Sequence, residues 1–217
     1  MSLRVAAAAF QEGYRLARIR TGEGLREALR ALGAERTPFA VEGAAMASYL
    51  RSSGTGHDAP LATLLEWDGG IWTPFVRLGA GCAAARLAEP PPEDPMAQDG
   101  FGFQSILTAG VSGHRLESGS TPLSRGQGRA LWFVLDGDAP ACVRRLADVP
   151  NPEGLWRGLG TACTFAGDPR DHAERLAEMS ERHHDDLTLG ARDALALWDS
   201  VGGTPDRAVR SAKTLVE

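Results

Sequence analysis

Three ionisable residues stand at the start of apolar, helix-forming stretches, where they could transfer or hold protons. Glu42 precedes GAAMASYL, Asp99 precedes GFGF, and Arg129 precedes ALWFV. If the three converge on one pocket, burial would shift the pKa values of the two carboxyl groups and suit them to proton transfer, while the guanidinium holds an anionic or carbonyl group. The alternative is that Glu42 and Asp99 cap helix N-termini, where free backbone N–H groups and the helix dipole stabilise a carboxylate.

Four aromatic residues and one amide lie in or near the same stretches. We expect them to line a pocket for an apolar substrate chain: Phe101, Phe103, Gln127, Trp132 and Trp156. Aromatic walls would shape such a chain and could stabilise a cationic intermediate through their π faces. Because Trp132 belongs to the apolar run LWFV, it is also typical of a buried helix core.

The glycines of RGQGRALWFV (residues 125–134) do not form a nucleotide-binding loop. The dinucleotide fingerprint requires a third glycine where Leu131 stands, and the segment ahead, HRLESGSTPLSR, does not resemble a strand. The Gly-x-Gly spacing recurs at residues 79/81, 100/102 and 158/160. Since glycine inside a helix costs about 1 kcal/mol relative to alanine, this repeated use indicates either close helix packing or the lining of a cavity.

Residues that bind metals or act as nucleophiles are present, but their spacing does not favour such sites. In ERHHDD (residues 181–186) the adjacent histidines project about 100° apart on a helix, so they do not form the pair on one face that a metal requires. Ser53, His57 and Asp58 lie too close in sequence to face one another as a triad. We therefore predict neither a metal nor any other cofactor.

Helix signals dominate the elements that would position these residues. A side-chain acceptor precedes proline at Asn151-Pro152, Asp168-Pro169 and Thr204-Pro205, and each pair predicts a helix start. The best strand candidate, residues 71–78, is interrupted by Pro74. We predict an all-α fold with little or no strand: a compact orthogonal bundle of roughly ten short helices. It would form a single domain over residues 1–217, with a proline-rich crossover at residues 89–98.

The composition limits the partners and the location that can be expected. A chain of 217 residues with 43% hydrophobic content can bury a full core. Its formal net charge of −5 gives no basic surface for a phosphate backbone, so we expect no nucleic-acid partner. No stretch approaches the roughly 20 apolar residues that span a bilayer. We expect a cytoplasmic protein without a membrane span, and small buried thiols at Cys82, Cys142 and Cys163.

Five sequence blocks follow one another along the chain: FxEGY (10–14), EGAAMA (42–47), DGFGF (99–103), GQGRALWFV (126–134) and LWRGLGTACTFAG (155–167). The pattern resembles the bacterial domain-of-unknown-function family 1702, which is often encoded beside enediyne polyketide synthases and in other natural-product gene clusters. The resemblance implies a cytoplasmic helical protein that serves the biosynthesis of a hydrophobic polyketide- or isoprenoid-like metabolite. Residues 104–124 depart from the family pattern, so neither the substrate nor the reaction is carried over.

Two hypotheses about function follow. The leading one is a cofactor-independent cyclase or isomerase that acts by proton transfer on a hydrophobic, polyene-like small molecule. The alternative is a non-catalytic helper that binds a biosynthetic synthase or its product; the lack of a recognised catalytic motif and the flat Gly/Ala helix faces favour it. An ionisation-type terpene synthase is disfavoured, because no aspartate-rich Mg²⁺ motif occurs and HHDD lacks the required spacing.

Overall fold

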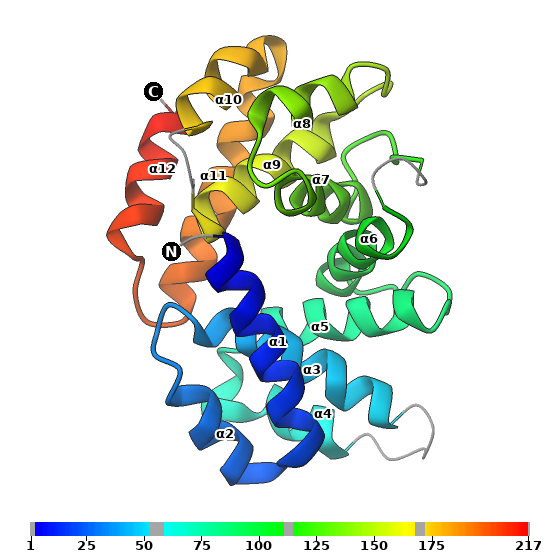
Figure 1. Ribbon diagram of the computed structural model, residues 1–217, viewed down its shortest axis with the longest axis vertical. Helices are drawn as coiled ribbons and strands as arrows, with labels where there is room; N and C mark the ends of the chain where they lie inside the picture. The colour runs from blue at the N-terminus through cyan, green and yellow to red at the C-terminus, as the bar shows by residue number, and fades with distance from the viewer. Residues whose placement is uncertain (1–2, 53–58, 111–114, 168–171, 217) are drawn as a thin grey trace. The chain divides into compact units, whose positions relative to one another are not determined.

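The computed structural model describes residues 3–52, 59–110, 115–167 and 172–216, and every regular element within these ranges is a helix (Figure 1). The all-α prediction is therefore confirmed, with twelve α-helices and two 3₁₀ helices in place of about ten helices. The helices are α1 Leu3–Ile19, α2 Gly22–Arg30, α3 Thr37–Ser52, α4 Ala59–Leu65, η1 Trp67–Gly70, α5 Thr73–Arg86, α6 Pro95–Ala109, α7 Pro122–Val134, α8 Ala139–Leu146, α9 Glu153–Ala166, α10 His172–Ser180, η2 Glu181–His183, α11 His184–Ser200 and α12 Asp206–Val216.

The chain forms two compact units, and the boundary between them falls inside α6. The N-terminal unit contains residues 4–101, and the C-terminal unit contains residues 102–217 together with the start of the chain. The single domain expected from the sequence stays a prediction. None of the helices in the described part of the chain is long and apolar enough to cross a membrane.

The proline signals mark helix starts to within one residue. Asn151 adopts a left-handed conformation (φ 49°), so α9 begins one residue later than the sequence suggested, at Glu153. Likewise α12 begins at Asp206, directly after Pro205. The third expected start, Asp168-Pro169, lies outside the described residues, as do Ser53, His57 and Asp58.

The strand candidate and the proline-rich crossover, which were also singled out in the sequence, contain helix starts as well. Pro74 lies in the first turn of α5, where its missing N–H would have no partner in the helix anyway, so the strand candidate at residues 71–78 is mostly helical. The crossover is shorter than expected, because α6 begins at Pro95. The Asp94 Oδ1 atom accepts hydrogen bonds from the Met96 and Ala97 N–H groups, both at 3.0 Å. Asp94-Pro95 is thus another cap followed by proline.

Glycines allow neighbouring helices to approach backbone to backbone in both units. A Cβ atom added to Gly13 of α1 would lie 1.8 Å from the Ala40 carbonyl oxygen of α3, and one added to Gly43 of α3 would lie 2.0 Å from the Phe10 oxygen of α1. Similar approaches, at 1.8–2.1 Å, join α3 to α5 and α5 to α6 in the N-terminal unit. In the C-terminal unit they join α6 to α7, α7 to α9 and α9 to α11. Close packing, rather than the lining of a cavity, therefore explains the glycines at these crossings.

The two glycines of a Gly-x-Gly sequence serve different neighbours. In α5, Gly79 contacts the earlier helix α3 and Gly81 contacts the later helix α6; α6 and α9 follow the same rule. Residues two apart project about 200° apart on a helix, so the two contacts occupy opposite sides. This leaves two sides of the helix that make no glycine contact. The residue directly before the first glycine and the residue three positions after that glycine project from one of these sides, and we call them the flanking positions. The residue between the two glycines projects from the opposite side.

Candidate functional site

The sequence-predicted site residues are divided between the two units. Glu42, Asp99 and Phe101 belong to the N-terminal unit. The C-terminal unit contains the other predicted site residues, which are Phe103, Gln127, Arg129, Trp132 and Trp156. That Glu42, Asp99 and Arg129 share one pocket stays a prediction.

Glu42 and Asp99 are buried carboxylic acids, with 7% and 2% of their surface exposed. Neither caps a helix: α3 begins at Thr37 and α6 at Pro95, with Asp94 as the capping residue of α6. Both therefore lie beyond the first four residues, whose N–H groups are the free donors of a helix N-terminus. The capping interpretation of these two residues is wrong, and the N-terminal unit encloses two acids within its helices.

Cys82 of α5 connects the helices that carry the two acids. Its Sγ atom lies 3.9 Å from the Glu42 Oε1 atom and 3.2 Å from the carbonyl oxygen of Gly100, the residue that follows Asp99. The Cys82 side chain is completely buried, and all three cysteines are buried free thiols, as predicted. The sequence reasoning treated Cys82 only as core and missed its contact with Glu42.

The flanking positions explain why these three side chains occur together. Glu42 directly precedes Gly43, Asp99 directly precedes Gly100, and Cys82 is the third residue after Gly79. Each therefore projects from the same side of its helix relative to the glycine contacts. This spacing is visible in the sequence and could have identified Cys82 as a candidate.

In the C-terminal unit, Arg129 of α7 packs against an aromatic pair. Its guanidinium carbon lies 5.1 Å from the centroid of the Phe103 ring, within the range of a cation–π interaction. Phe103 in turn meets Phe133 edge to face, with ring centroids 5.6 Å apart and an interplanar angle of 79°. Arg129 and Phe103 are both at flanking positions, three residues after Gly126 and Gly100. The two predicted site residues are therefore in contact.

A second charged cluster joins α7, α9 and α11. The Arg157 guanidinium makes a two-pronged contact with the Asp193 carboxylate, at 2.6 Å from Nε to Oδ2 and 3.0 Å from Nη2 to Oδ1. Arg125 Nη1 lies 3.9 Å from the same Oδ2 atom. All three side chains are partly buried. The sequence reasoning missed this cluster, although each member is at a flanking position.

Gln127 lies between Gly126 and Gly128, so it projects from the opposite side of α7 to Arg129. Its side chain is fully buried, and Oε1 accepts a hydrogen bond of 2.7 Å from the Glu117 N–H group. Gln127 therefore fastens the segment before α7, and its role in substrate binding stays a prediction. Phe101, between Gly100 and Gly102, is half-buried in a corresponding position on α6.

The two predicted tryptophans are buried in the C-terminal unit. Trp132 is fully buried, and its Nε1 donates to the Gly167 carbonyl oxygen at 3.4 Å. Trp156 is 4% exposed and stacks on the His183 ring, with centroids 5.6 Å apart and an interplanar angle of 16°. One face of the Trp156 ring is therefore already covered by the protein. Their role in substrate binding stays a prediction.

Metal-ligating side chains do not gather in the described part of the chain. No group of three or more His, Cys, Asp or Glu side chains there is placed to hold a metal ion. In the ERHHDD segment, His183 Nδ1 lies 3.5 Å from the Asp186 Oδ2 atom, and His184 Nδ1 lies 3.4 Å from the Ser180 hydroxyl. These pairwise contacts account for both histidines.

Comparison with known proteins gives one family match. Residues 120–217 match the model of the family described as "Protein of unknown function (DUF1702)". The matched part contains the blocks GQGRALWFV and LWRGLGTACTFAG, so it supports the resemblance to family 1702 that these blocks suggested. No curated protein and no solved structure was found to match the chain.

Proposed function

We propose that the protein is a cofactor-independent cyclase or isomerase that acts by proton transfer on a hydrophobic, polyene-like substrate. The pathway we propose is natural-product biosynthesis of the polyketide, enediyne or isoprenoid type, because of the resemblance to family 1702. The observation that carries the proposed chemistry is the pair of buried acids, Glu42 and Asp99, on α3 and α6 of the N-terminal unit.

Burial of these acids is difficult to explain by stability alone. A carboxyl group removed from water costs free energy unless it is compensated, and apolar residues at the same positions would avoid that cost. Carboxylic acids enclosed by helices are, in contrast, suited to giving and accepting protons away from bulk water. Neither acid is needed to start its helix, as the positions of the caps demonstrate.

Arg129 would bind the polar end of the substrate. A guanidinium group remains charged at every relevant pH and presents a planar set of donors to a carboxylate or carbonyl oxygen. The rings of Phe103 and Phe133 beside it provide apolar contact for the adjoining chain. This combination favours a long apolar molecule with one oxygen-bearing end.

The alternative of a non-catalytic helper has lost part of its support. It rested partly on flat Gly/Ala helix faces that could receive a partner protein. At the glycine crossings described above these faces are occupied by helices of the same chain, with backbone atoms about 2 Å from the position of an added Cβ atom. With these faces occupied and two acids buried, we favour an enzyme over a helper.

The test uses a panel of conjugated polyenes with a carboxylate or carbonyl end, beginning with cis-parinaric acid, incubated with purified protein in D₂O. Mass spectrometry measures deuterium incorporation, and absorbance measures loss or movement of the conjugated system. We expect Glu42→Gln and Asp99→Asn to lower the rate by at least about 100-fold, the lower range for general acid–base catalysis. We expect Arg129→Ala mainly to raise KM.

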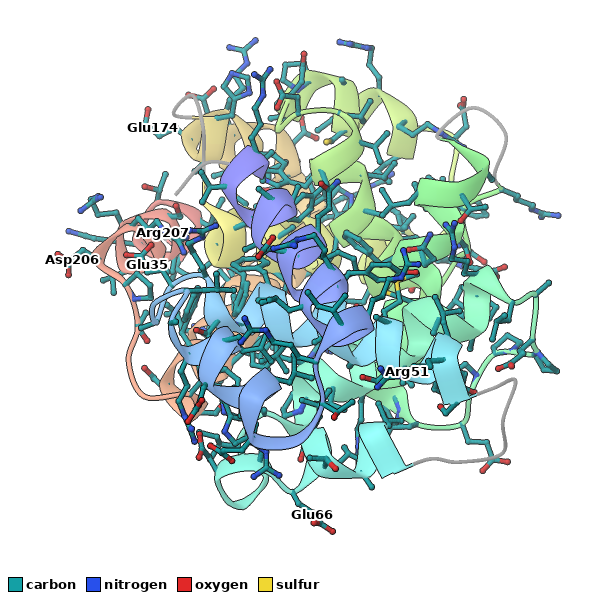
Figure 2. The ribbon with its side chains drawn as sticks, turned by 60° about the horizontal axis from the view of Figure 1, so that its bottom comes forward. Glu35, Arg51, Glu66, Glu174, Asp206 and Arg207 are labelled. Atoms are coloured by element: carbon teal, nitrogen blue, oxygen red, sulfur yellow. The ribbon has the colours of Figure 1, made fainter. Side chains whose placement is uncertain are left out.

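The matched control is Glu66→Gln, since Glu66 is exposed and its side chain points away from the helices in Figure 2. Circular dichroism checks that every variant is folded. Unchanged turnover in all three site variants would contradict the assignment of the residues. Binding of the polyenes without turnover, together with co-elution of the protein with a biosynthetic synthase, would instead favour the helper.

A further inference from the structure

We infer that Cys82 is a positioning residue whose thiol hydrogen follows the protonation state of Glu42. The inference rests on the proposed function, in which Glu42 gains and loses a proton. It adds a residue that touches neither the apolar chain nor its polar end and that acts only through Glu42.

The geometry gives one hydrogen two acceptors. The Cys82 Sγ atom is 3.2 Å from the Gly100 carbonyl oxygen and 3.9 Å from Glu42 Oε1, and a thiol has a single hydrogen to donate. When Glu42 is neutral, the nearer carbonyl oxygen is the better acceptor. When Glu42 is ionised, the carboxylate becomes the stronger acceptor, because hydrogen bonds to a charged group are stronger than those between neutral groups. Rotation about the Cβ–Sγ bond then redirects the hydrogen without moving a heavy atom.

Because of this rotation, the Cys82 thiol would donate a hydrogen bond in both protonation states of Glu42. A buried donor or acceptor that loses its partner is costly, and a fixed donor would stabilise only one state of the acid. The thiol is a weak donor, so it holds neither state so strongly that proton transfer is blocked. Alanine at this position would leave no hydrogen to follow the charge, whereas serine would keep one.

Other titratable groups lie on the helices packed against α3. On α5 these are Arg77, which pairs with Asp94, and Arg86. The helix α1 carries Tyr14 and four charged residues, of which Glu12 and Arg15 pair with each other, and α4 carries no titratable side chain. The arginines of α2 pair with Glu23 and Asp68. Asp99 lies on α6, one residue before the carbonyl that accepts from Cys82. The thiol is therefore placed to respond both to Glu42 and to the helix that carries Asp99.

The test is an infrared titration of the full-length protein without substrate. The S–H stretching region contains no other protein absorption, and the band missing in Cys82→Ala identifies Cys82 among the three thiols. The carboxyl band missing in Glu42→Gln identifies Glu42. We expect the Cys82 band to move to lower wavenumber with the same midpoint as the Glu42 titration, and to stay fixed in Glu42→Gln. The bands of Cys142 and Cys163, which lie in the other unit, serve as internal controls.

Variants provide the second readout. Cys82→Ala should move the midpoint of the Glu42 titration to higher pH, because the ionised form loses a donor, and Cys82→Ser should restore at least half of this change. The pH profile of polyene turnover should move in parallel, whereas Cys142→Ala should leave both unchanged. A Cys82 band that stays fixed while Glu42 titrates would refute this inference alone. If the Cys82 band stays fixed but Glu42→Gln loses turnover, the proposed function still stands. A Glu42 that never titrates would refute both this inference and the proposed function.

Discussion

The crossing of α7 and α9 gives the most direct test of the packing, through Gly158→Ala. A Cβ atom added to Gly158 would lie 2.1 Å from the Arg125 carbonyl oxygen, 2.7 Å from the Arg129 nitrogen and 2.9 Å from the Gly128 Cα atom. All three are backbone atoms of α7, so no side chain can rotate away to make room. The two helices themselves would have to separate.

The size of the effect follows from the distance. Ordinary van der Waals contact begins at 3.4 Å, so the helices would have to move apart by about 1.3 Å. A gap of about 0.5–1 Å already removes a quarter to a half of the dispersion energy of each contact across an interface. Overpacking costs about 1–3 kcal/mol and sometimes more, whereas the helical preference of alanine returns about 0.5–1 kcal/mol. With an overpacking cost in the upper part of that range, we expect a net loss of about 2 kcal/mol in the free energy of unfolding.

Urea unfolding followed by far-ultraviolet circular dichroism measures this loss. The matched control is Gly24→Ala in α2, where no atom lies within 4 Å of the added Cβ atom. That variant should gain up to about 1 kcal/mol, because alanine is preferred over glycine inside a helix. Gly158→Ala should therefore lower the free energy of unfolding, and Gly24→Ala should raise it. If Gly158→Ala were as stable as the unmodified protein, the α7–α9 crossing would be adjustable and the argument from backbone contact would fail.

Two further substitutions test local features by the same unfolding assay. Ala88, at the end of α5, adopts a left-handed conformation (φ 57°) that favours glycine, so Ala88→Gly should stabilise the protein by about 0.5–1 kcal/mol; a decrease would contradict this reasoning. Burial and then the nearby Asp138 charge raise the pKa of Cys142 from 9.0 to about 12. Because the unfolded chain releases this proton above about pH 9 while the folded protein keeps it, stability is lost as the pH rises from 9 toward 12, by roughly 1.4 kcal/mol per pH unit. Between pH 8 and pH 10.5, Cys142→Ala should therefore lose about 2 kcal/mol less than the unmodified protein; equal losses would show that this thiol titrates normally.

The helical fold was predictable because its signals are local. An acceptor before proline marks a helix start wherever it occurs, and Asp94-Pro95 obeys the same rule although it lies in a segment expected to be irregular. The start of α9 at Glu153 instead of Pro152 was harder to predict, since it depends on the left-handed conformation of Asn151. The close approach of the helices was also foreseeable, because glycine inside a helix needs a compensating contact.

The contacts of the candidate site required the pairing of helices, which is not local. Glu42 and Cys82 are forty residues apart in sequence, and Arg157 and Asp193 are thirty-six apart. No local pattern states which helix will lie beside which. The carboxyl groups were identified from their apolar surroundings, but the same surroundings were compatible with caps until the helix bounds excluded that interpretation.

The position of a residue relative to the glycines nevertheless separates the polar residues from the apolar ones. Directly before the first glycine of each crossing helix stand five charged residues and two leucines, namely Glu12, Glu42, Leu78, Asp99, Arg125, Arg157 and Leu189. No charged residue stands directly after that glycine, where the chain has Tyr14, Ala44, Ala80, Phe101, Gln127, Leu159 and Ala191. Because each glycine fixes which side of its helix is used for packing, this difference assigns the charges to one remaining side of each helix and the core to the other. Substitutions of Glu42 and Asp99 in the first set should therefore change chemistry, and substitutions at the second set should change stability.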